Sequence, residues 1–273
     1  MHFFELLAEK EVNAKEEIAR FEQLLYEKTA DDFSVYSILN NNILRLPSNI
    51  RGTNCCINDF FQNYGLDNTW SVRKKDVEKL VLYIEIILTI LKHLKKHVSG
   101  FFPLMDNVKI IIANANHLAD VLNYEVKEWE NTVILVPKNQ ELQLAENYLV
   151  KRNKNLAMDV WHYEHSSMKG NIEQKRAVLQ ELGSFVEPYL SKMESVLRDN
   201  VGFLLNNLNI RHNNLKGAKS NAWVQSLNPV DLESWYDKTF ALLLRTIITK
   251  NQEGLVNEVE LLRKRFKNKG GVA

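Results

Sequence analysis

The feature that most constrains the fold is a run of apolar residues at helical spacing near the C-terminus. Asn228-Pro229-Val230-Asp231 is a favourable helix start, because asparagine caps a helix and both proline and an acidic residue suit its first turn. Apolar residues then recur every three or four positions: Leu232, Trp235, Tyr236, Phe240, Leu243, Leu244 and Ile247. A helix with so continuous an apolar face must be covered by other elements, which indicates a packed helical protein.

Similar periodicity predicts further helices along the chain. They are expected over residues 13–28, 72–99, 106–122, 140–152, 171–183 and 188–209. Pro188 is expected in the first turn of the helix that it precedes. Gly254 is expected to separate the apolar helix from a last one, which ends in a basic run from Arg263 to Lys269.

One segment has a different pattern. Residues 124–137 read as two short strands joined at Glu130-Asn131, and Pro137 ends the second strand. The predicted fold class is therefore mainly α, a multi-helix bundle with one short β-hairpin insertion. We expect an N-terminal helical region at residues 1–105 and a second helical domain at residues 106–273, which would contain the hairpin near 124–137.

Charge and cysteine content exclude some classes of protein. Lys+Arg number 35 and Asp+Glu number 34, so any contact with RNA must come from a local basic patch rather than from net charge. Cys55 and Cys56 are adjacent, which disfavours a disulfide between them and fits a reducing compartment. The apolar stretch from Leu80 contains Glu85 and is too short to span a bilayer, and the N-terminus lacks the pattern of a signal peptide. These features predict a cytoplasmic protein with no membrane contact.

The polar stretch between two expected helices, Leu208 to Gly217, contains the candidate site. Arg211 and Lys216 can hold a phosphate and stabilise the charge that develops during its cleavage. His212 can transfer a proton near neutral pH, and Asn213 can orient a hydroxyl group. The same polar run is also typical of a helix C-terminus, where cations lie near the last carbonyl groups.

Two helices around an Arg-polar junction resemble the HEPN superfamily, the all-helical domains of bacterial toxin and abortive-infection proteins. Arg211 and His212 match the first two positions of its signature, which is arginine, a polar residue and a later histidine. Residues 163–176 and 206–214, with the segment ending at Asn139, resemble abortive-infection proteins of the AbiJ kind. The chain departs from the signature at Lys216, which stands where the family has its second histidine.

The resemblance implies a homodimeric anti-phage defence or toxin-type protein that acts on RNA as a metal-independent endoribonuclease. It implies catalytic roles for Arg211, His212, Asn213 and Lys216, with no cofactor and no metal. The remaining candidates are expected to bind substrate: Asn214, Lys219, Lys169, Lys175 and Arg176. The substitution at Lys216 favours an alternative, a non-catalytic helical interaction or sensor module that works with a partner protein of a defence system.

A third possibility is a metal-dependent hydrolase centred on His162, Glu164 and His165. These side chains are of types that bind zinc, but they lack a supported third ligand and the His-Glu-x-x-His order of a metalloprotease. An aromatic-rich helix that packs on a neighbour explains the same residues, with Lys169, Lys175 and Arg176 at its edge.

Overall fold

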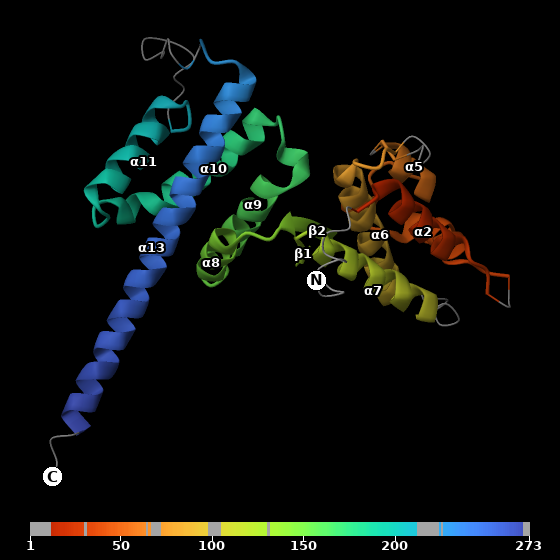
Figure 1. Cartoon of the computed structure of the whole chain (residues 1–273), viewed down its shortest axis with the longest axis horizontal. Coiled ribbons are helices and arrows are strands. Elements are labelled where there is room, and N and C mark those ends of the chain that lie inside the picture. Colours follow the sequence, from red (N-terminus) through yellow and green to blue (C-terminus); the bar gives the residue numbers. More distant parts are fainter. Residues whose placement is uncertain are drawn as a thin grey trace, which may run out of the picture. The chain divides into compact units, whose positions relative to one another are not determined.

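The computed structural model describes residues 12–29, 32–63, 65–66, 72–97, 105–129, 132–211, 224 and 226–269 (Figure 1). Helices dominate these residues, and their one sheet is a two-stranded antiparallel hairpin, which confirms the predicted fold class. The chain divides into two compact units, Met1–Pro137 and Lys138–Ala273.

The first unit is built around α6. Its elements are α2 (Ala14–Tyr26), α3 (Val35–Asn42), η1 (Ile43–Arg45), α4 (Ser48–Arg51), α5 (Ile57–Asn63), α6 (Val77–His97), α7 (Met105–Val121), β1 (Tyr124–Trp129) and β2 (Thr132–Pro137). Almost every side chain of α6 from Leu80 to Leu91 is buried, because α2, α3, α7 and β2 pack around this helix. No helix among the described residues is both long and apolar enough to cross a membrane.

Side chains of α6 accept hydrogen bonds from backbone N–H groups on the outer edge of the hairpin, which β2 forms. The Leu135 N–H donates to Glu85 Oε1 at 2.5 Å, and the Val133 N–H donates to Thr89 Oγ1 at 2.9 Å. Residues four apart on a helix are separated by about 6 Å along its axis, and residues two apart on a strand by about 6.7 Å, so the two spacings match. The buried Glu85 and Thr89 therefore act as hydrogen-bond partners for a strand edge that would otherwise lack them.

The second unit is organised along α13. Its elements are α8 (Gln140–Leu149), α9 (Lys154–Glu164), η4 (Ser166–Met168), α10 (Ile172–Leu190), α11 (Ser195–Asn207) and α13 (Pro229–Lys269). The first half of α13 packs against α8, α10 and α11 through the predicted apolar face, of which Tyr236, Phe240 and Leu243 are among the buried members. Tyr163 of α9 stacks on Phe240 at a centroid distance of 3.9 Å, with the ring planes 5° apart.

Two predicted helix breaks are wrong. Helix α10 continues through Gly183, where a Cβ atom would lie 3.0 Å from Leu205 Cδ2, so glycine allows close approach of α11 rather than ending the helix. Pro188 lies in the last turn of α10 rather than the first turn of the next helix. Helix α13 likewise continues through Gly254, because one glycine costs a helix only about 1 kcal/mol.

The unit boundary also differs from the predicted one. A division at residue 105 would separate α6 from α7, yet these helices pack together, and α7 also packs on β1. The boundary between the compact units instead falls after Pro137, so the hairpin belongs to the N-terminal unit.

Candidate functional site

The backbone at the end of α11 positions Arg211, the first residue of the candidate motif. Asn209 adopts a left-handed conformation with φ of 59°, which asparagine tolerates better than most residues, and it is buried. The chain then turns back, so that the Arg211 N–H donates to the Leu205 carbonyl at 2.9 Å. Arg176 of α10 donates from Nε to the Asn209 carbonyl. The helix end is thus held by its own backbone and by α10.

The guanidinium of Arg211 makes two polar contacts with neighbouring helices. Its Nη2 atom is buried and lies 3.2 Å from Oε1 of Glu187 on α10, an ion pair in which Nη2 makes no hydrogen bond. Its Nη1 atom donates to Oδ1 of Asn206 on α11 at 3.1 Å. The Arg211 side chain as a whole is 28% exposed and that of Glu187 is 58% exposed, so the pair lies at the surface of the α10–α11 junction. The guanidinium therefore joins two helices of the same unit.

The other residues of the predicted catalytic and binding set fall into two groups. His212, Asn213, Asn214, Lys216 and Lys219 lie outside the described residues. Lys169, Lys175 and Arg176 are described, and of these three only Lys169 is exposed. Arg176 holds the Asn209 carbonyl and approaches Glu173 within 3.8 Å.

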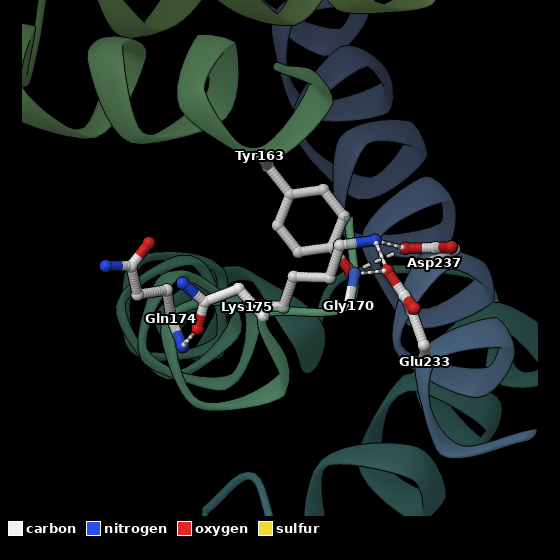
Figure 2. A network of polar contacts seen from close by, with 7 residues as sticks. Tyr163, Gly170, Gln174, Lys175, Glu233 and Asp237 are labelled. Carbon is white, nitrogen blue, oxygen red and sulfur yellow. Dashed lines mark hydrogen bonds and ion pairs between the residues drawn. The ribbon is translucent and has the colours of Figure 1, made fainter. Parts of the chain in front are cut away.

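Lys175 lies at the centre of a polar network that joins four segments (Figure 2). Its ammonium group lies 2.7 Å from Asp237 Oδ1 and 2.8 Å from Glu233 Oε1, two carboxylates one turn apart on α13. The Tyr163 hydroxyl of α9 donates to the same Asp237 oxygen at 3.0 Å, and the Gly170 N–H donates to Glu233 at 2.8 Å. The Lys175 side chain is 8% exposed. In this arrangement its charge is neutralised inside the unit and is not available to an RNA phosphate.

The network shifts the pKa values of its members in opposite directions. Burial lowers the pKa of Lys175, but hydrogen bonds and charge interactions with Asp237 and Glu233 outweigh burial, so the pKa is raised. The hydrogen bond from Lys175, followed by that from Gly170, lowers the pKa of Glu233. Burial, and then the charge of Asp237, raise the pKa of the neighbouring Glu164, against the opposing effect of Lys175. One ammonium group thus pairs with two carboxylates, and all three groups belong to the same unit.

His165, one of the three proposed metal ligands, caps a short helix. It follows the end of α9 and is the N-cap of η4. Its Nδ1 atom accepts from the Ser167 N–H at 3.2 Å and lies 2.7 Å from Ser167 Oγ. No group of three or more His, Cys, Asp or Glu side chains in the described part of the chain is arranged to hold a metal ion.

Sequence reasoning missed the acidic partners of the basic residues. Glu187, Glu233 and Asp237 have no predicted role, although Glu233 and Asp237 flank the aromatic residues on the apolar face of α13. Acidic residues four apart beside an otherwise apolar helix face were a usable signal for a buried basic partner.

Comparisons with known proteins add no family assignment. No protein-family model, curated protein or solved structure matches this chain. The resemblance to the HEPN superfamily therefore stays a prediction from the sequence.

Proposed function

We propose that this chain is a non-catalytic helical interaction module, in which the Arg211 motif ties helices together rather than cleaving RNA. The observation that carries the proposal is the pairing of the Arg211 guanidinium with Glu187 and Asn206 across the α10–α11 junction. A phosphate-binding arginine would have to exchange a carboxylate partner for the substrate. Lys175 supports the same conclusion, since two carboxylates already neutralise its ammonium group.

The endoribonuclease remains a second candidate because of where the Arg211–Glu187 pair lies. Glu187 is largely exposed, and exposed ion pairs contribute little and open readily. Arg211 also directly precedes His212, so an opened pair would present a guanidinium next to an imidazole. The role in a bacterial defence system is likewise a proposal from the resemblance.

RNA cleavage by the purified chain distinguishes the two functions. The chain would be incubated with end-labelled structured and single-stranded RNA in the presence of a chelator, beside the Arg211→Ala and Lys216→Ala variants. Arg198→Ala is the matched control, because Arg198 is an arginine on α11 whose ion pair with Asp199 is local and exposed. We expect intact RNA in all four reactions. Cleavage by the wild type that is lost in Arg211→Ala and kept in Arg198→Ala would overturn the proposal and establish the nuclease.

A further inference from the structure

The second half of α13 carries large apolar side chains on the surface. From Gly254 to Lys264 every side chain that the structure describes is exposed. Leu255 is 59% exposed, Val259 is 42% exposed and Leu262 is 51% exposed, and Val256 is exposed to a similar degree. Figure 1 shows this half of the helix extending beyond the other helices of its unit. The first half of the same helix, by contrast, is packed.

These four residues share one helix face. At 3.6 residues per turn, Leu255, Val259 and Leu262 follow the alternating four- and three-residue spacing of a helix–helix seam, and Val256 lies beside them. The face exposes on the order of 400 Å² of apolar surface, a size at which patches on monomeric proteins are often functional. It continues into a shallow hollow that Gln252, Glu260 and Arg263 also line.

Charges along this segment are separated by sign. Glu253, Glu258 and Glu260 come first, and the sequence from Arg263 to Lys269 then contains five basic residues and no acidic one. Two copies aligned in parallel would place these basic ends side by side, which is repulsive. Two antiparallel copies would place the basic end of each against the acidic part of the other. The segment is therefore complementary to itself in one orientation.

We propose that this face of α13 binds the same face of a second copy of the chain in an antiparallel orientation. The proposal names a partner for the interaction module and in that respect rests on the proposed function. Pairing Val259 with Leu262 of the second copy centres the seam on the twofold axis. The seam runs from Gln252 to Lys269, about 25 Å of helix, which is a small interface. The expected dissociation constant is on the order of 10 µM.

Sedimentation equilibrium of the full chain tests the proposal. The average mass should rise from 31.8 kDa towards twice that value as the concentration increases from about 1 to 200 µM. Val259→Glu/Leu262→Glu should weaken association at least about tenfold, because it places four carboxylates in the seam. The control is Val230→Glu, which puts one carboxylate on an exposed valine in the first turn of the same helix and should leave association unchanged. A monomeric wild type, or equal effects of the two changes, would overturn the proposal.

Disulfide trapping tests the orientation. In a background with Cys55 and Cys56 replaced by serine, oxidation of Val259→Cys/Leu262→Cys should link position 259 of one copy to position 262 of the other. Peptide mass spectrometry would identify this link, and links only between identical positions would refute the antiparallel arrangement. Failure here is distinct from failure of the proposed function. A monomer that leaves RNA intact contradicts the dimer alone, whereas Arg211-dependent cleavage contradicts the module.

Discussion

Replacing Lys175 by methionine should destabilise the second unit, because it removes the cation from a network that contains two carboxylates. Methionine keeps most of the apolar stem, so the change isolates the charge. Loss of one partner from a fully buried ion pair costs about 3 to 5 kcal/mol. Here the Glu233 side chain is 18% exposed and that of Asp237 is 51% exposed, so water can solvate the abandoned carboxylates in part. We expect a loss of about 2 kcal/mol in the free energy of unfolding at pH 7.

Urea unfolding followed by circular dichroism measures this loss, and hydrogen exchange of α10 and α13 peptides locates it. Lys192→Met is the control, since Lys192 is an exposed lysine of the same unit and its loss should change the free energy of unfolding by less than about 0.5 kcal/mol. Adding Glu233→Gln and Asp237→Asn to Lys175→Met should restore much of the stability, because no unpaired carboxylate remains. A Lys175→Met variant as stable as Lys192→Met would refute the reasoning.

The same network has a defined pH dependence. The pKa of Glu233 is lowered in the folded chain, so its pairing with Lys175 stabilises the fold above the ordinary value of 4.5. That stabilisation is lost as the pH falls through the lower folded value. Between neutral pH and the acid range, the free energy of unfolding should therefore fall more for the wild type than for Lys175→Met. Parallel plots of this free energy against pH for the two proteins would contradict the prediction.

Three further changes test packing and electrostatics elsewhere in the fold. Glu85→Leu should lower the free energy of unfolding by about 2 kcal/mol, because it leaves the buried Leu135 N–H without an acceptor. Glu85→Gln keeps an acceptor, and thermal unfolding of both variants measures the difference. Asp159→Asn should stabilise the chain by about 1 kcal/mol at pH 7, because burial and then Glu181 raise the pKa of Asp159 from its ordinary value of 3.8 to about 6. The gain should shrink as the pH falls below about 6 and vanish only below 3.8, where the wild-type carboxyl is protonated in both states. Gly183→Ala should destabilise the chain by about 1 kcal/mol, because the new Cβ contacts Leu205 on the facing helix. Gly202→Ala, with no atom within 4 Å of its new Cβ, should stabilise the chain by up to about 1 kcal/mol. Urea unfolding that ranks the two variants in the opposite order would contradict the packing argument.

Periodicity predicted most of the fold because an amphipathic helix must show its buried face in the sequence. The stripe after Pro229 and the hairpin at 124–137 both formed as expected. Gly183 and Gly254 misled the prediction because a helix-interior glycine looks the same whether it ends a helix, admits a neighbouring helix or lies on an exposed surface. The role of Glu85 could not be inferred, since its partner is a backbone N–H 50 residues away.

The candidate site was less predictable than the fold. Composition identified Arg211 as unusual, but its role depends on which carboxylate the fold brings to it, and Glu187 is distant in the sequence. Lys175 and Arg176 are adjacent and chemically alike, yet one lies inside a charge network and the other holds a helix end. Tertiary packing, rather than residue type, separates a binding residue from a structural one.

A double-mutant cycle on Arg211 and Glu187 tests most directly the central claim that Arg211 holds two helices together. The free energy of unfolding would be measured by urea denaturation for the wild type, Arg211→Ala, Glu187→Ala and the double variant. We predict a stabilising coupling of about 0.5 to 1 kcal/mol, which fits a pair at the surface of the junction. Additive effects, with Arg211→Ala as stable as the wild type, would contradict the structural role and return Arg211 to the candidates for binding RNA.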